Sequence, residues 1–146
     1  YKVGKEQFIV FVSTIIGVLA AGLLVGIGIG ILVKAIIHII NGAPIGSLFK
    51  PSIRLENVGG DTATVKVENS AVFSTWIALK NRIGGQNANK IVVDLSNTKL
   101  VDHTVMANLD ALSNEFVESD RELSVTGLEE HTQLSDHPLA ARKKSN

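Results

Sequence analysis

The chain has 146 residues, 45% of them apolar, and a mean hydropathy of +0.26. That length suffices for one domain of ordinary size, but the composition is too apolar for a uniformly water-soluble one. The formal net charge is zero, and residues 102–136 carry nine carboxylates against Arg121 alone, which argues against a nucleic-acid partner. The absence of cysteine excludes disulfides, thiolate metal sites and thiol catalysis.

The first part of the chain is a long apolar run. Between Glu6 and Lys34 lie 27 consecutive residues without a charge. As a single helix this run would reach about 40 Å, against a hydrocarbon core of roughly 30 Å. We therefore predict that residues 1–42 form one membrane-spanning helix, or two shorter ones if the chain breaks at residues 20–22. A secretory signal peptide and the buried helix of a larger soluble protein are the alternatives.

Glycine is frequent within the apolar run, where Gly22, Gly26 and Gly30 form a series of small residues spaced four apart. A helical face stripped of side chains lets the backbone of another helix approach closely. We expect these three glycines to mark helix packing in the membrane. The alternative is that glycine is simply common in membrane helices.

Beyond the apolar run, Pro44 and Pro51 predict a helix end and an extended linker over residues 43–51, followed by a soluble domain over residues 52–146. Three basic residues follow the charge-free run before residue 55, and two precede it. The positive-inside rule thus gives a slight preference for placing the soluble domain on the cytoplasmic side.

The soluble part alternates strand and helix patterns. Period-two alternation predicts strands at residues 53–56, 63–68 and 123–126, and a continuous β-branched run predicts a central strand at residues 91–95. Apolar stripes at helical spacing predict helices at residues 72–83 and 105–116. The order β-β-α-β-α-β predicts an α/β fold in which helices pack on a mixed four-stranded sheet. For the last residues we expect a short helical turn and a frayed basic end.

Few side chains suggest chemistry. Asp94 lies in an apolar strand, and we expect it near the exit of that strand rather than in a catalytic role. His131 and His137 are too far apart in sequence for a helical metal pair, and we expect them on the surface of the tail. We predict no catalytic residues, no cofactor and no metal, and therefore no enzyme.

Three segments together resemble the C-terminal end of a SulP-family anion transporter. They are LLVGIGIGILV, IVVDLSNTKLVDHTVMANLDAL and the ending GLEEHTQLSDHPLAARKK. The resemblance covers almost the whole chain and implies the last membrane segment or segments followed by a cytoplasmic STAS domain, the fold of anti-sigma-factor antagonists. Because the chain begins with Tyr1 rather than Met, we expect it to be a fragment of a longer protein.

The resemblance implies secondary active transport of an inorganic anion, such as sulfate or bicarbonate, across the inner or plasma membrane. The STAS domain would serve regulation and assembly. The anion site of such transporters lies between half-helices in earlier membrane segments, so this chain should not transport alone. The expected partners are membrane lipid, the remaining transmembrane segments and a second protomer as a homodimer.

The start of the second helix offers one regulatory hypothesis. In anti-sigma-factor antagonists the corresponding loop reads Asp-Ser-Ser-Gly, with the second serine as phosphate acceptor; here it reads Asp102-His103-Thr104-Val105. A helix N-terminus would stabilise a phosphate on Thr104. Asp102 or Thr104 could instead merely cap the helix, and we favour the cap because two of the four residues differ. The alternative function is a membrane-tethered signalling module that binds a kinase or anti-sigma partner through the Thr104 face.

Overall fold

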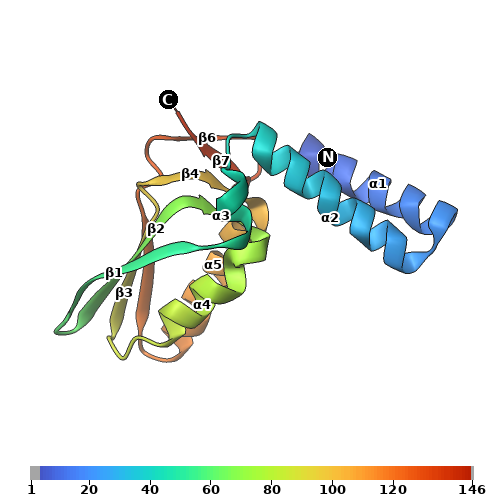
Figure 1. Cartoon of the computed structure of the whole chain (residues 1–146). Helices are drawn as coiled ribbons and strands as arrows, with labels where there is room; N and C mark the ends of the chain where they lie inside the picture. The colour runs from blue at the N-terminus through green and yellow to red at the C-terminus, as the bar shows by residue number, and fades with distance from the viewer. Residues whose placement is uncertain (1–3, 146) are drawn as a thin grey trace.

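The computed structural model describes residues 4–145, with the backbone alone for residues 57–59. An apolar hairpin of two helices, α1 (Lys5–Ala21) and α2 (Leu23–Ile40), projects from an α/β domain. The domain is formed by the part of the chain that follows α2. Figure 1 shows that both open ends of the hairpin lie at the domain, while the α1–α2 turn points away from it. The apolar run therefore folds back on itself.

The break between the two helices falls on a single residue. Gly22 adopts a φ of +90°, a conformation that L side chains rarely adopt, and its amide still donates to the Val18 carbonyl at 2.9 Å. With 17 and 18 residues, the helices are about 25 and 27 Å long at ~1.5 Å per residue, close to one hydrocarbon thickness each. Among residues 4–145, α2 is the one helix that satisfies both length and apolarity for a membrane span.

Glycines determine how closely the two helices pack. A Cβ on Gly26 would lie 2.4 Å from the backbone nitrogen of Val18, and one on Gly30 would lie 2.1 Å from the Thr14 hydroxyl. Gly22, by contrast, lies at the turn, where a Cβ would meet nothing within 4 Å. Of the three glycines that the sequence marks for helix packing, Gly26 and Gly30 are at the contact and Gly22 makes the turn.

The segment expected to be an extended linker contains a short helix, α3 (Ile45–Phe49). Its inner side is fixed by Ser47, whose hydroxyl lies 2.6 Å from that of Ser70, and by Leu48, which is buried in a small apolar cluster. The members of that cluster are Ala43, Leu48, Val72 and Leu100. Residues 43–51 are thus packed on the domain.

The sheet has seven strands in the described part of the chain: β1 (Ser52–Gly59), β2 (Thr62–Ala71), β3 (Lys90–Asp94), β4 (Thr98–Val101), β5 (Glu122–Thr126), β6 (His131–Gln133) and β7 (Arg142–Lys144). The order is β5-β3-β2-β4-β7-β6, with β1 also paired to β2. Strands β3 and β4 run parallel to β2, as β5 does to β3, whereas β1 is antiparallel to β2 and β7 to both β4 and β6. The sheet is therefore mixed, as predicted.

The predicted number of four strands is wrong, because β4, β6 and β7 were not recognised. Strand β4 has only four residues, and strands β6 and β7 have three each, with no apolar alternation to reveal them. Tertiary pairing stabilises them instead: Arg142 pairs with Val101 of β4, and Gln133 pairs with Arg142. The C-terminal segment forms a sheet edge where a helical turn was expected.

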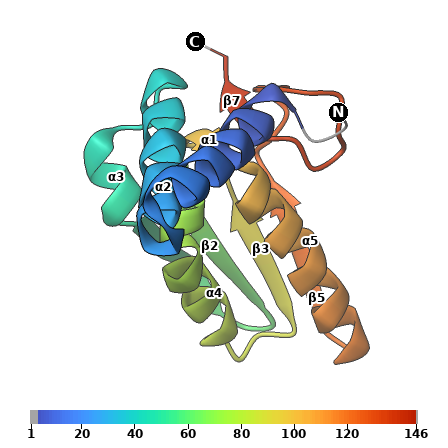
Figure 2. The same ribbon diagram turned by 90° about the vertical axis from the view of Figure 1, so that its right-hand side faces the viewer.

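Two helices cover one face of the sheet. A 3-10 turn, η1 (Phe73–Thr75), leads into α4 (Trp76–Gly84), and α5 (His103–Glu118) follows β4. Figure 2 shows α4 and α5 on the same face of β2 and β3, below the hairpin. Between helices and sheet lies the main core, whose fully buried members include Val65, Ile83, Ile91, Val93, Val101 and Val105.

Candidate functional site at the junction of hairpin and domain

The carboxylate of Asp102 lies at the centre of the junction between the hairpin and the domain. Asp102 is the N-cap of α5 and is 1% exposed. Its Oδ1 accepts a hydrogen bond from the amide of Val105 at 2.8 Å, and its Oδ2 accepts one from the amide of Phe73 at 2.9 Å. Of the two residues considered as helix cap, Asp102 fills that position, and the same carboxylate ties η1 to α5.

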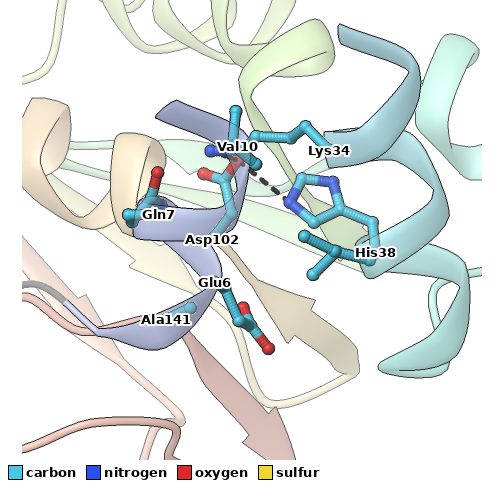
Figure 3. Close-up of a pocket in the computed structure, with 8 residues that line it drawn as sticks. Glu6, Gln7, Val10, Lys34, His38, Asp102 and Ala141 are labelled. Atoms are coloured by element: carbon cyan, nitrogen blue, oxygen red, sulfur yellow. Dashed lines mark ion pairs between the residues drawn. The ribbon is translucent and has the colours of Figure 1, made fainter. Parts of the chain in front are cut away.

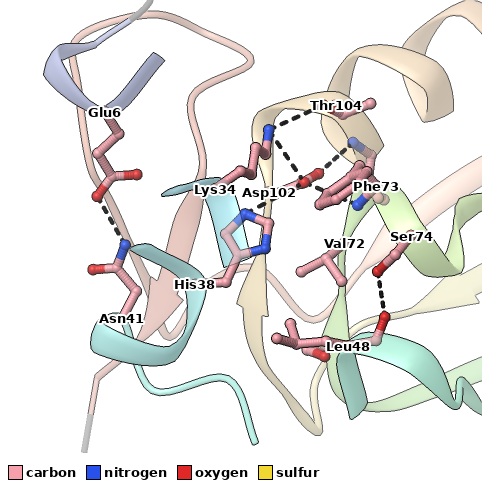
Figure 4. A network of polar contacts seen from close by, with 12 residues as sticks. Glu6, Lys34, His38, Asn41, Leu48, Val72, Phe73, Ser74, Asp102 and Thr104 are labelled. Atoms are coloured by element: carbon pink, nitrogen blue, oxygen red, sulfur yellow. Dashed lines mark hydrogen bonds and ion pairs between the residues drawn. The ribbon is translucent and has the colours of Figure 1, made fainter. Parts of the chain in front are cut away.

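Two basic side chains of α2 reach the same carboxylate from the hairpin. The Lys34 ammonium and the His38 Nε2 each lie 3.5 Å from Oδ2 of Asp102 (Figure 4). Because they are four residues apart, they project from the same face of α2. Both also lie near the Phe73 ring, the ammonium 5.5 Å from its centroid and the imidazole centroid at 5.9 Å. The junction thus joins α2, η1 and α5.

Burying a carboxylate costs several kcal/mol unless charged or hydrogen-bonding groups replace the lost water. Asp102 has both kinds of compensation: two backbone amides from the domain, and from the hairpin the charge of the Lys34 ammonium with the His38 imidazole beside it. The compensation is divided between the two parts of the molecule. Separating the hairpin from the domain would therefore remove the Lys34 ammonium and the His38 imidazole from the carboxylate of Asp102.

The two neighbours of Asp102 in the sequence hypothesis also lie at this junction. Thr104 is the second residue of α5, and its hydroxyl accepts a hydrogen bond from the Lys34 ammonium at 3.4 Å. His103 points to the C-terminal segment, where its Nδ1 donates to the Leu139 carbonyl at 2.6 Å and its ring meets that of His137 edge to face. The hydroxyl proposed as a phosphate acceptor is therefore half-buried against α2.

Sequence reasoning missed the contribution of α2. Lys34 and His38 are the two ionisable residues near the end of an otherwise apolar helix, and their spacing of four places them on one face. That spacing was the available signal. No local pattern indicated that this face would meet the N-terminus of α5, about seventy residues further along the chain.

Polar contacts around the carboxylate close the junction on several sides (Figure 4). At the base of the hairpin, the Asn41 amide donates to the Glu6 carboxylate at 2.8 Å, joining the end of α2 to the start of α1. On the side of α3, the Ser74 hydroxyl donates to the Leu48 carbonyl. The first bond fixes α1 against α2 within the hairpin, and the second fixes α3 against η1 of the domain.

A cavity of about 10 Å³ lies between the hairpin and Asp102 (Figure 3). Its lining comes from α1, α2, the N-terminus of α5 and the C-terminal segment, namely Glu6, Gln7, Val10, Lys34, Ile37, His38, Asp102 and Ala141. Ligand pockets in proteins are typically about 300–1,000 Å³. The packing at Asp102 therefore suits a junction between two parts better than a substrate site.

The other residues singled out in the sequence lie elsewhere. Asp94 is the last residue of β3, and its Oδ1 accepts the Ser96 amide at 2.8 Å, with the Lys66 ammonium 3.9 Å from Oδ2. Burial by itself would raise the pKa of Asp94, but the hydrogen bonds from Ser96 and the Lys66 charge outweigh it and lower that pKa.

His131, the first residue of β6, is buried, not on the surface as expected. Its Nε2 donates to the Thr98 carbonyl of β4 at 2.7 Å. His137 lies apart from it, in the contact with His103. Among residues 4–145, no three His, Asp or Glu side chains are grouped so as to hold a metal ion.

Comparison with known proteins adds one finding. No family model matches the chain, and no curated protein matches it. Among solved structures, the chain is similar to the STAS domain of an anti-sigma-factor antagonist from Rhodobacter sphaeroides. The similarity has a TM-score of 0.46 and 17% sequence identity, and it covers 62% of this chain and 98% of that one.

Proposed function

We propose that this chain is the C-terminal part of a SulP-type secondary active transporter of inorganic anions of the sulfate or bicarbonate class. In this proposal the hairpin is embedded in the cell membrane, and the α/β domain is a cytoplasmic STAS domain that serves regulation and assembly. The observation that carries the proposal is an apolar hairpin with outward-facing side chains, anchored to the domain through a buried carboxylate.

The surface of the hairpin supports a membrane environment. Large apolar side chains project outward along both helices, and near the turn Leu19 and Leu24 are 82% and 86% exposed. Monomeric soluble proteins rarely expose contiguous apolar patches larger than a few hundred Å². The charge-free run between Glu6 and Lys34 means that no ion would have to enter the hydrocarbon along either helix.

The junction supports a role for the domain in regulating the membrane part. A displacement of α2 would pull Lys34 and His38 away from Asp102, which caps α5 and holds η1. Movements of the hairpin and of the domain are therefore coupled through one buried group. In the proposed transporter the anion site lies in other membrane segments, between half-helices whose dipoles face the substrate. The described hairpin supplies lipid and helix contacts rather than that site.

The proposal is tested with the complete reading frame that carries this chain. We expect cells expressing it to take up labelled sulfate or bicarbonate, and the Asp102→Ala variant to transport less at equal membrane abundance because the domain is uncoupled. Asp110→Ala, an exposed carboxylate on the same helix, is the matched control. A reading frame with no further membrane segments, or one that gives no uptake of either anion, would overturn the proposal.

The alternative is a membrane-tethered signalling module that acts through the Thr104 face. The half-buried Thr104 hydroxyl and its contact with Lys34 make this face accessible to a kinase or anti-sigma partner only when the junction opens. Pull-down with the full chain in detergent discriminates the two functions. Capture of such a partner that is lost on Thr104→Glu, in cells without anion uptake, would favour the signalling module.

A further inference from the structure

The short helix α3 presents an apolar surface that nothing in residues 4–145 covers. Ile45 and Phe49, one helical turn apart, are 63% and 78% exposed. Their orientation is fixed, because Ser47 and Leu48 on the opposite side are buried against the domain. Two large apolar side chains are therefore held outward by a rigidly packed helix.

This surface continues that of the hairpin. α2 ends at Ile40, which is 74% exposed, and only four residues separate it from the start of α3. In Figure 1, α3 lies directly beside the domain end of α2. A membrane that surrounds the hairpin would have its boundary near this end, where the chain passes into the domain.

The charge beside the apolar pair is positive. Residues 35–55 contain no carboxylate, and the exposed Lys50 directly follows Phe49. Aromatic side chains with a neighbouring Lys or Arg are typical of segments that lie at the membrane–water boundary, where the ring enters the acyl chains and the cation meets lipid phosphates.

We infer that α3 docks on the surface of an anionic bilayer, with Ile45 and Phe49 inserted at the level of the upper acyl chains and Lys50 among the headgroups. This inference rests on the proposed membrane location of the hairpin. It adds a second membrane contact, which fixes the tilt of the domain relative to the bilayer. The occupant of the α3 surface is lipid rather than protein.

Spin labelling tests the inference in the whole chain. Because the protein has no cysteine, single-cysteine variants need no altered background. Phe49→Cys reports α3, and Leu24→Cys reports the hairpin turn. Thr62→Cys, at an exposed residue that begins β2, is the control in water. In Figure 1 the turn between β1 and β2 lies at the end of the sheet that points away from the hairpin. Each variant is labelled with a nitroxide and reconstituted in vesicles of phosphatidylcholine and phosphatidylglycerol. Circular dichroism verifies that each one is folded.

The readout is the ratio of collision rates with oxygen, which concentrates in lipid, and with a water-soluble nickel chelate. We expect labels at positions 49 and 24 to favour oxygen, the position-24 label more strongly, and the label at position 62 to favour nickel. A position-49 label that behaves like position 62, while position 24 favours oxygen, would overturn the α3 contact and leave the proposed function standing. Nickel access at both 49 and 24 would overturn both.

A label at position 49 that is immobile and shielded from both reagents would show a protein contact, such as a second copy of the chain, and would also overturn the inference. An independent site guards against a local effect of the label. Ile45→Cys should give the same preference for oxygen as Phe49→Cys, and opposite results at the two positions would likewise rule out a shared lipid-facing surface.

Discussion

Replacing Asp102 by alanine removes the group that joins the hairpin to the domain. The change deletes the N-cap of α5 and leaves the buried amide of Val105 and the half-buried amide of Phe73 without their acceptor. It also leaves Lys34 and His38 without the carboxylate that they contact. Loss of an N-cap costs about 1 kcal/mol. An unpaired buried amide costs about 1–3 kcal/mol, and removing one partner of a buried ion pair about 3–5 kcal/mol. These contributions overlap, so we expect a destabilisation of roughly 3–5 kcal/mol.

The assay is chemical unfolding of the chain in detergent micelles, followed by the fluorescence of Trp76. Trp76 is the single tryptophan of the chain and packs against the core of the domain, so it reports domain unfolding. Asp110→Ala removes an exposed carboxylate from the same helix and should change the free energy of unfolding by less than about 0.5 kcal/mol. A change for Asp102→Ala as small as that of the control would refute the structural role of Asp102.

A double-mutant cycle then isolates the contact between the two parts. Lys34→Met removes the cation while keeping an apolar side chain of similar length, and it is combined with Asp102→Asn. If the junction couples the hairpin to the domain, the two effects should differ from additivity by about 0.5–3 kcal/mol. Additivity within about 0.3 kcal/mol would mean that the two groups do not interact, and the coupling argument would fail.

Four further predictions concern other parts of the molecule. Gly26→Ala should destabilise the hairpin, because the added Cβ would lie 2.4 Å from the Val18 nitrogen. Gly28→Ala, where a Cβ would have nothing within 4 Å, should be neutral or stabilise the helix by up to about 1 kcal/mol. Thermal unfolding in micelles compares the stabilities of the two variants, and equal effects would contradict the close packing at Gly26. Because the pKa of Asp94 is lowered in the folded state, its contribution to stability is present above its ordinary value of 3.8 and is lost as the pH falls through the lower folded value. The stability difference between wild type and Asp94→Asn should therefore shrink below that pH, and a difference independent of pH would count against the lowered pKa. A chain beginning at Ala43 should unfold cooperatively and at a higher denaturant concentration than one beginning at Pro51, which lacks the buried Leu48; identical midpoints would show that α3 adds nothing to the domain. Thr104→Val should lower the free energy of unfolding by less than about 1 kcal/mol, because the cap of α5 is Asp102 and the substitution loses only the 3.4 Å contact with Lys34. Mass spectrometry should find no phosphate at Thr104 in cells, and a phosphate there would revive the regulatory hypothesis.

Local patterns in the sequence were sufficient for the longer regular elements, but not for the short ones α3, β4, β6 and β7. The charge-free apolar run predicted helical structure over residues 7–33, and α1 and α2 together occupy that run apart from the turn at Gly22. Alternation at residues 63–68 and the stripe at residues 105–116 determined β2 and α5, since side-chain periods of 2 and 3.6 follow directly from backbone geometry. The position of Asp102 before an apolar stripe was enough to suggest a helix cap.

The tertiary structure decided what depends on distant parts of the chain. A glycine at residue 22 permits a turn but does not require one, so only the packing of Gly26 against Val18 showed that the helix folds back. Strands β6 and β7 have too few residues to carry a pattern, and they exist because β4 offers an edge to pair with. The contact of Lys34 and His38 with Asp102 likewise brings together residues that no local rule relates. Sequence periodicity fixes which face of an element is apolar, whereas the pairing of faces is a property of the whole folded chain.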